Sequence, residues 1–210
     1  MTTLLVIAKE PVPGRVKTRL TPHFSPREAA RLAEAALADT LATALAAPAH
    51  RRVLVLDGAP GPWLPPGFEV VPQATGGLDE RLACAFGQCH GPAVLLGMDT
   101  PQVTPEHLRP ALAPHAWDQC SAWFGPAVDG GFWALGMAVP DPALLRGVPM
   151  STADTGRLQR ERLTHAGLTV RDLPLLRDVD TAYDAGVVAA EAPDSRFAAV
   201  LGQLTKAGAR

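Results

Sequence analysis

Short apolar runs alternate with helical patterns along most of the chain, and this alternation limits the fold more than any other feature of the sequence. The runs within residues 3–8, 52–57 and 93–98 have the length and composition of strands that are buried on both faces of a sheet. Helical periodicity lies between them, most clearly from residue 26 to about residue 47. A strand, a crossover helix and a second strand normally form a parallel pair. The chain is therefore expected to have an α/β fold with a mostly parallel sheet.

The rest of the chain continues this pattern with one interruption. The strands expected at 120–124 and 132–137 follow one another without a helix, so they are expected to add an antiparallel piece. The other expected elements are a strand at 68–71, helices at 79–89, 105–113 and 152–165, a strand at 168–173, and helix after residue 184. A length of 210 residues without a linker-like stretch suits a single domain, 1–210.

Charge and cysteine content exclude several classes of function. The net charge is −2 and charged residues make up 19% of the chain, which argues against a nucleic acid or a membrane surface as partner. Three cysteines without CxxC spacing predict reduced thiols and a cytoplasmic protein. The first apolar run is too short for a signal peptide or a membrane span. Any anion-binding site must therefore be local.

A basic loop, residues 9–20, follows the first expected strand. It contains a single acid, Glu10, and two of the three lysines of the chain. Pro11, Pro13 and Gly14 stiffen and turn its backbone. A rigid basic loop at the carboxyl end of a strand suits phosphate binding, and a solvated charged turn is the alternative. The four cations of the loop are Lys9, Arg15, Lys17 and Arg19.

Aspartates follow other expected strands at the same edge of the sheet. Asp99 comes directly after the third apolar run, where it could bind Mg²⁺ or Mn²⁺ or could cap the turn before Pro101. Asp57 precedes a Gly/Pro-rich loop, and a role in that turn is favoured. Asp178 and Asp180 are spaced by one residue. Only one of these two side chains is expected to reach the site.

An Asp-Gly-Gly turn at 129–131 separates the two strands of the expected antiparallel piece. Asp-Gly is a common hairpin signal, and paired glycines also allow a sugar or a base to approach the backbone closely. The sequence has neither a Walker A motif nor a G-x-G-x-x-G motif after the first strand. A P-loop protein and a dinucleotide-binding protein are therefore disfavoured.

Five motifs occur in an order that resembles the DUF2064 family. They are K-E-P-V-P-G-R-V-K-T-R-L, Q-x-x-G-G-L-D-E-R-L, G-M-D-T-P, A-V-D-G-G-F-W-A-L-G and D-V-D-T-x-x-D, and the resemblance covers residues 3 to about 185. That family resembles the nucleotide-diphospho-sugar transferases of GT-A fold, a fold shared with MobA-like and phospholactate-guanylyltransferase-like nucleotidyltransferases. The resemblance implies a three-layer, Rossmann-like α/β/α fold with a mostly parallel sheet.

The resemblance also implies which residues bind a nucleotide. The basic loop would contact the phosphates through Lys9, Arg15, Lys17 and Arg19. A second loop would line the base and ribose pocket through Gln73, Gly77, Leu78 and Arg81. In the family this second loop is usually close to G-D-L-G-E-R, whereas here it is G-G-L-D-E-R at 76–81. The exchanged glycine and aspartate leave the detailed contacts of this loop open.

Metal and acceptor contacts are implied in the same way. Asp99 would bind the divalent metal, Mg²⁺ or Mn²⁺, with Asp180 as the second carboxylate. Asp129, Gly130 and Gly131 would face the acceptor or the sugar. The residues expected to take part in catalysis are Lys17, Asp99 and Asp129.

These residues point to a metal-dependent transferase that uses a nucleotide or nucleotide-sugar donor and a small-molecule acceptor. Glycosyl transfer and nucleotidyl transfer both need a divalent cation and basic side chains to absorb charge on phosphate oxygens, so both remain open. A non-catalytic nucleotide-binding module is the first alternative. A phosphohydrolase with Asp99 or Asp57 as nucleophile is a weaker one.

Overall fold

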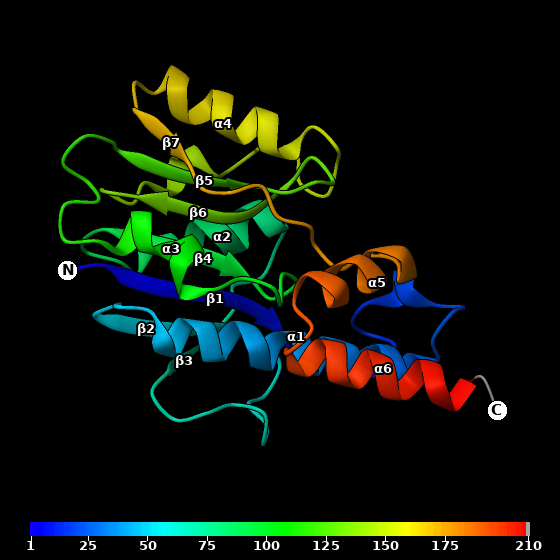
Figure 1. Cartoon of the computed structure of the whole chain (residues 1–210). Coiled ribbons are helices and arrows are strands. Elements are labelled where there is room, and N and C mark those ends of the chain that lie inside the picture. Colours follow the sequence, from blue (N-terminus) through cyan, green and yellow to red (C-terminus); the bar gives the residue numbers. More distant parts are fainter. Residues whose placement is uncertain (209–210) are drawn as a thin grey trace.

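The computed structural model describes residues 1–208, which form a seven-stranded sheet with helices on both faces (Figure 1). The strands are β1 (Thr3–Lys9), β2 (Arg51–Asp57), β3 (Glu69–Pro72), β4 (Ala93–Gly97), β5 (Ala122–Pro126), β6 (Phe132–Met137) and β7 (Val170–Asp172). Their spatial order is β3-β2-β1-β4-β6-β5-β7. Strand β6 is antiparallel to β4 and β5, and the other pairings described are parallel. The expected α/β fold with one antiparallel piece is confirmed.

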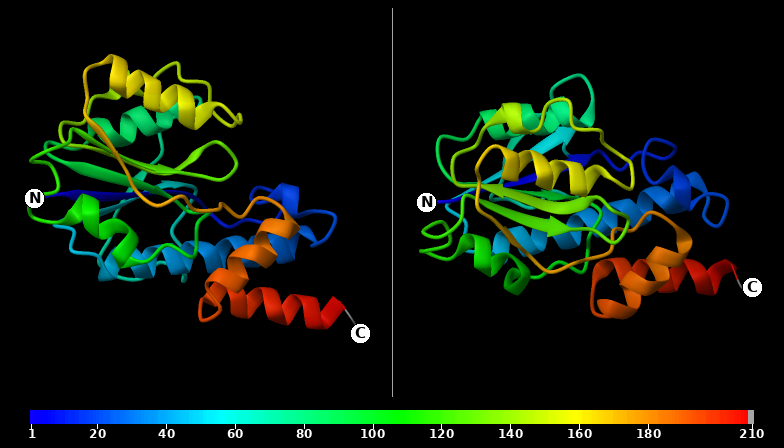
Figure 2. Two further views of the ribbon diagram at one scale, coloured as in Figure 1. Left: turned by 45° about the horizontal axis from the view of Figure 1, so that its top comes forward. Right: turned by 90° about the horizontal axis from the view of Figure 1, so that it is seen from above.

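The helices form one layer on each face of this sheet (Figure 2). They are α1 (Pro26–Ala46), α2 (Leu78–Gly87), α3 (Pro105–Leu112), α4 (Thr155–His165), α5 (Ala182–Glu191) and α6 (Arg196–Gly208), with short 3₁₀ turns η1 (Thr18–Leu20) and η2 (Pro142–Leu144). Helices α1 and α3 cover one face, and α2 and α4 cover the other. None of the helices within residues 1–208 is both long enough and apolar enough to cross a membrane.

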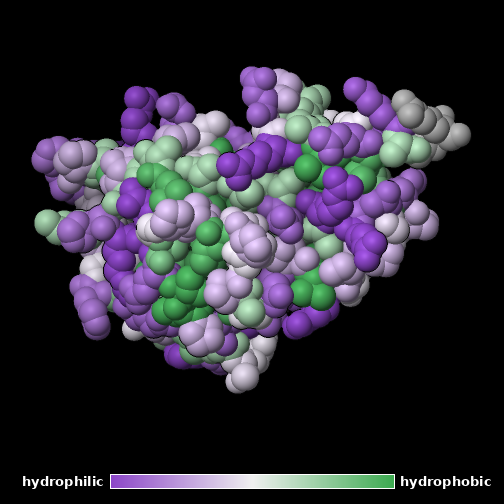
Figure 3. All heavy atoms as spheres, turned by 90° about the horizontal axis from the view of Figure 1, so that it is seen from below, coloured by the Kyte–Doolittle hydropathy of each residue, from purple (hydrophilic) through white to green (hydrophobic). Residues whose placement is uncertain are grey.

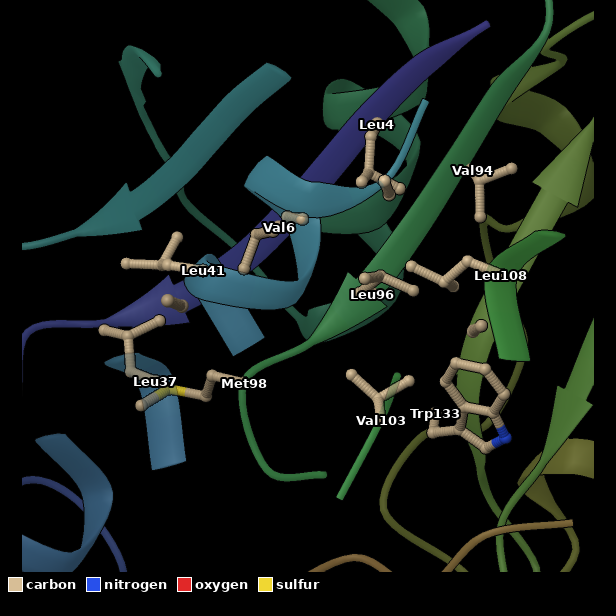
Figure 4. Packing of buried hydrophobic residues seen from close by; sticks show 14 of the residues in the cluster. Leu4, Val6, Leu37, Leu41, Val94, Leu96, Met98, Val103, Leu108 and Trp133 are labelled. Atoms are coloured by element: carbon tan, nitrogen blue, oxygen red, sulfur yellow. The ribbon is translucent and has the colours of Figure 1, made fainter. Parts of the chain in front are cut away.

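Alternation along β1 explains how one strand serves both layers. Leu4 and Val6 pack with Leu37 and Leu41 of α1 (Figure 4), whereas Leu5 belongs to the apolar cluster that includes α2. Each of these side chains is buried. Because β1 is covered on both faces, its sequence reads as a continuous apolar run.

Helices α5 and α6 pack against each other, and α6 packs against α1. Leu32 of α1 and Phe197 of α6 share a third apolar cluster. Asp39 of α1 also accepts hydrogen bonds from the backbone N–H groups of Arg196 (3.1 Å) and Phe197 (2.9 Å) at the start of α6. From below, hydrophobic residues appear in patches separated by hydrophilic side chains (Figure 3). The carboxyl-terminal helices are thus fastened to α1 by apolar packing and by a helix cap.

The direction in which successive strands are added reverses between β1 and β4. From β1 the chain builds outward to β2 and β3, and then crosses back to β4 on the other side of β1. Ligands of open α/β sheets bind at the carboxyl ends of the strands at such a reversal. The segment after β7 returns to this edge, because the backbone N–H of Val179 donates to the Asp99 carbonyl at 2.9 Å. The fold therefore brings residues near 9, 99 and 179 to one place.

Candidate active site

A cleft of about 680 Å³ lies at this edge of the sheet. Its walls come from the ends of β1 and β4, from the first turns of α2, from the turn before β6 and from residues 150–155 and 178–184. Ile7, Leu82, Leu95 and Phe132 form an apolar part of the lining. Ligand pockets typically measure about 300–1,000 Å³ and combine apolar walls with a few polar groups, so this cleft has the size and composition of a small-molecule site.

The Lys17 ammonium group lies between two carboxylates beside the cleft. Its Nζ is 2.9 Å from Asp99 Oδ1 and 3.2 Å from Asp180 Oδ1, and its side chain is only 7% exposed. Arg19 contacts the other oxygen of Asp180 at 2.9 Å. Burial by itself lowers the pKa of the Lys17 ammonium, but the Asp99 and Asp180 carboxylates outweigh burial and hold its pKa above the ordinary value. Lys17 is therefore a permanently charged group at neutral pH.

The basic loop holds Lys17 through its neighbours in the sequence. Val16 is buried in the cluster of α1 and α3, and Leu20 is buried in the cluster shared with α6. Between these anchors Lys17 has a left-handed backbone, with φ 49° and ψ 39°, and it starts the η1 turn. Two apolar anchors thus fix the place from which the lysine side chain extends.

The four cations of the basic loop meet around a second, smaller hollow of about 250 Å³. Lys9 and Arg19 line both this hollow and the main cleft. Arg15 is 61% exposed and lies 3.8 Å from Asp57. The structure therefore gathers the predicted phosphate-binding residues, but it places Lys17 in a buried ion pair and leaves the others more accessible.

Asp178 is an acidic residue of the cleft to which the motifs of the sequence assign no role. Both Asp178 and Asp180 line the cleft, so the expectation that only one would reach the site is wrong. The expectation overlooked that side chains two residues apart lie on the same side of an extended segment, and the intervening Val179 is buried in the core. Asp178 accepts a hydrogen bond from Thr100 Oγ1 at 2.9 Å. Burial, reinforced by the nearby charge of Asp99, raises the pKa of the Asp178 carboxyl to about 7.

Gln73 and Arg81 also line the cleft. The Gln73 amide donates to the carbonyls of Ala8 (2.7 Å) and Val55 (3.2 Å), and its oxygen accepts from Arg81 at 3.0 Å. Arg81 also donates to the carbonyl of Gly77 at 3.4 Å. Gln73 therefore ties β1 and β2 to Arg81 instead of presenting a free amide to the cleft. Of the other residues predicted here, Leu78 lines the cleft and Gly77 caps the start of α2.

Replacement of Gln73 with alanine should lower the free energy of unfolding by about 1–3 kcal/mol, because two backbone carbonyls and Arg81 lose their partner. Urea denaturation measures the loss. Gln203→Ala is a matched control on the exposed side of α6 and should stay within about 0.5 kcal/mol of the parent protein. Equal effects of the two substitutions would contradict the bridging role of Gln73.

The Asp-Gly-Gly turn divides its residues between the cleft and the segment that precedes α4. Asp129 and Gly131 line the cleft, and the Asp129 carboxylate accepts the backbone N–H of Gly131 at 2.8 Å. Gly130 has φ 89°, and a Cβ there would lie 2.0 Å from the carbonyl oxygen of Ala153. Gly130 thus packs against the segment before α4, where only glycine fits. A role for Gly130 in acceptor binding stays a prediction.

A further wall of the cleft was not anticipated from the sequence. Met150, Ser151 and Thr152 line it just before α4, and Ser151 has a left-handed backbone with φ 60°. Thr155 fastens this wall, since its hydroxyl accepts from the N–H of Thr152 at 3.0 Å and donates to the Pro149 carbonyl at 2.9 Å. The sequence predicts the start of a helix at this point, and a helix start does not indicate that the residues before it line a cleft.

The carboxylates around Lys17 suit a divalent cation in their chemistry. Mg²⁺ and Mn²⁺ prefer carboxylate oxygens, and the Lys17 ammonium shows that Asp99 and Asp180 together hold a positive group. Within residues 1–208, no group of three or more His, Cys, Asp or Glu side chains is arranged to hold a metal ion. A cation at this position would therefore take few ligands from the protein and would need others from solvent or substrate.

Solved structures with the same fold include several transferases. A protein from Desulfovibrio desulfuricans G20, described provisionally as a nucleotide-diphospho-sugar transferase, has a TM-score of 0.84 and 27% identity over 99% of this chain and 95% of its own. CMP:2-keto-3-deoxy-manno-octonic acid synthetase, complexed with CTP, has a TM-score of 0.59 and 13% identity over 92% of this chain and 99% of its own. Rv0371c from Mycobacterium tuberculosis H37Rv, complexed with manganese, has a TM-score of 0.50 and 24% identity over 89% and 96%. The last two similarities concern the fold alone.

The comparison with protein families agrees with the order of motifs in the sequence. The search of curated proteins found no match. A family profile described as "Uncharacterized protein conserved in bacteria (DUF2064)" matches residues 31–152, which is more than half of the chain. The fold is the three-layer, Rossmann-like arrangement of nucleotide-diphospho-sugar transferases and related nucleotidyltransferases. The chain belongs to the DUF2064 family.

Proposed function

We propose that this chain is a metal-dependent transferase that binds a nucleotide or a nucleotide sugar in the cleft and transfers part of it to a small-molecule acceptor. The observation that carries the proposal is the meeting of the four loop cations with Asp99 and Asp180 at the strand-order reversal. The CTP complex and the manganese complex among proteins of this fold support it. So does the likeness to the Desulfovibrio protein.

The basic loop would act on the phosphates of the donor. Lys9, Arg15 and Arg19 are accessible around the smaller hollow, where they can donate hydrogen bonds to phosphate oxygens. Negative charge grows on the leaving phosphate or pyrophosphate during transfer, and fixed cations near it lower the barrier. Asp99 and Asp180 would hold Mg²⁺ or Mn²⁺, which when bound neutralises charge on phosphate oxygens.

The opposite part of the cleft would hold the base and the acceptor. Arg81 is kept in place by Gln73, and both Arg81 and Leu78 line the cleft. Asp129, Gly131 and Thr152 supply polar groups at the other wall, where an acceptor hydroxyl would bind. Displacement at phosphorus and displacement at an anomeric carbon place the same demands on these residues. The proposal therefore covers both glycosyl and nucleotidyl transfer.

Nucleotide binding is the first test. Nucleoside triphosphates and nucleoside-diphosphate sugars, each with and without Mn²⁺, should be screened by thermal denaturation. A ligand at 100 times its dissociation constant stabilises a protein by about 2.7 kcal/mol. For a chain of this size that corresponds to a rise of about 5–10 °C in Tm. Nucleosides without phosphate are the matched controls and should shift Tm much less, because the basic loop recognises phosphate.

The products then separate the candidate activities. Release of a nucleoside phosphate or of pyrophosphate in the presence of an acceptor supports transfer. Binding without any release supports a nucleotide-binding module. Release of inorganic phosphate from simple esters supports a phosphohydrolase, although the carboxylate of Asp57 faces Arg15 outside the main cleft. If no nucleotide shifts Tm in either metal condition, the proposed function is wrong.

A further inference from the structure

We infer that Lys17 makes binding of a divalent cation by Asp99 and Asp180 conditional on the nucleotide. Without a nucleotide, the Lys17 ammonium occupies the space between the two carboxylates. When donor phosphates enter the smaller hollow, they attract the ammonium and free the carboxylates. The inference rests on the proposed function, because it assigns an order of binding within the same site.

Three of the four carboxylate oxygens of Asp99 and Asp180 already contact basic side chains. Asp99 Oδ1 and Asp180 Oδ1 both contact Lys17 Nζ, and Asp180 Oδ2 contacts Arg19. Mg²⁺ needs oxygen ligands at about 2.0–2.1 Å and in near-octahedral order. An ammonium that stays about 3 Å from the same two oxygens would repel such an ion and occupy the space that its other ligands need. The lysine and the metal therefore exclude one another.

The position of Lys17 provides a place to which the ammonium can move. The smaller hollow is lined by Lys17 together with the three other cations of the loop, and Asp99 and Asp180 also border it. Phosphates bound there would lie within reach of the flexible four-carbon side chain. The backbone need not move, since Val16 and Leu20 are buried on either side of it. A side-chain rotation is enough to exchange the carboxylates for phosphate oxygens.

The simpler possibility is a permanent ion pair that holds the carboxyl-terminal segment against the basic loop. In that case the two carboxylates would lose their geometry when the lysine is removed, and their affinity for a cation would fall or stay the same. If Lys17 competes with the cation for the carboxylates, removal of the lysine raises their affinity for the cation instead. Metal affinity in the absence of nucleotide therefore distinguishes the two roles without any assay of activity.

The experiment is a titration of nucleotide-free protein with Mn²⁺ alone, followed by electron paramagnetic resonance of the free ion. The parent protein should bind Mn²⁺ weakly, and Lys17→Met should bind it about tenfold or more tightly because a competing positive charge is gone. Lys17→Asn is the second neutral variant. Asparagine tolerates the left-handed backbone at φ 49°, so this variant is expected to fold even if Lys17→Met does not.

Two control variants complete the test. Lys206→Met removes an exposed lysine of α6, and Lys17→Arg keeps the positive charge in the site. Both should leave the affinity for Mn²⁺ near that of the parent protein. Unchanged or weaker Mn²⁺ binding by the folded neutral variants would overturn the inference. Failure of the proposed function would appear separately, as an absence of nucleotide binding to the parent protein in thermal denaturation.

Discussion

Replacement of Asp99 with asparagine should lower the rate at which the proposed donor is turned over by about 10²–10³-fold, the size of effect expected when one fixed electrostatic contact in an active site is lost. Asp99 projects from the end of β4 at the strand-order reversal, and its side chain contacts Lys17. Asparagine keeps the shape of the side chain but loses the charge that a cation needs. Steady-state release of nucleoside phosphate or pyrophosphate, with Mg²⁺ or Mn²⁺ present, measures the rate.

The fold should survive this substitution. The Asp99 side chain is 38% exposed, and the contact with Val179 uses the backbone carbonyl, which asparagine retains. The melting temperature should therefore remain close to that of the parent protein. Asp118→Asn is a matched control on an exposed loop and should change neither rate nor stability. A rate for Asp99→Asn close to that of the control would remove Asp99 from the reaction.

The second large effect is expected at Gly130, where alanine should lower the free energy of unfolding by about 3–5 kcal/mol. The added Cβ would lie 2.0 Å from the Ala153 carbonyl oxygen, and the left-handed φ of 89° would be strained as well. The close neighbour is backbone, so a rotation of a side chain cannot relieve the clash. Urea denaturation measures the change, and a larger exposure of the segment 150–155 to protease should accompany it.

Substitutions at two other glycines distinguish the cost of a left-handed backbone from the cost of a clash with the added Cβ. Gly147 also has a left-handed φ, 73°, but a Cβ there would meet nothing within 4 Å, so Gly147→Ala should cost only about 1–2 kcal/mol. Gly202 lies within α6 and faces open space, so Gly202→Ala should stabilise the protein by up to about 1 kcal/mol. If Gly130→Ala costs no more than Gly147→Ala, close packing against Ala153 is not what selects glycine.

Features that depend on neighbours in sequence could be predicted well. The capping box of Ser25 and Glu28 starts α1 as expected, with each side chain bonded to the backbone of the other. The apolar runs became buried strands, and the pair at 122–137 became the antiparallel piece. These features follow from periodicity, capping and turn chemistry, each of which is readable within about ten residues.

Features that depend on distant partners could not be predicted in the same way. The cluster of cations at 9–19 was visible, but the sequence holds no sign that Lys17 alone is buried between Asp99 and Asp180. Gln73 lines the cleft, but the sequence holds no sign that its side chain bonds to the carbonyls of Ala8 and Val55 and to Arg81. Asp178, in contrast, could have been predicted, because side chains two residues apart share one side of an extended segment and the intervening Val179 faces the core.

The contact between Lys17 and Asp180 joins residues that are 163 positions apart. During synthesis the basic loop leaves the ribosome early, and its acidic partner emerges only after all seven strands have been made. Until then the loop is a cluster of positive charge without its carboxylates. Contacts of such long sequence separation also form late in folding, because closing a long loop costs entropy. A growing chain therefore acquires its core first, and the docking of its carboxyl-terminal helices completes the site last.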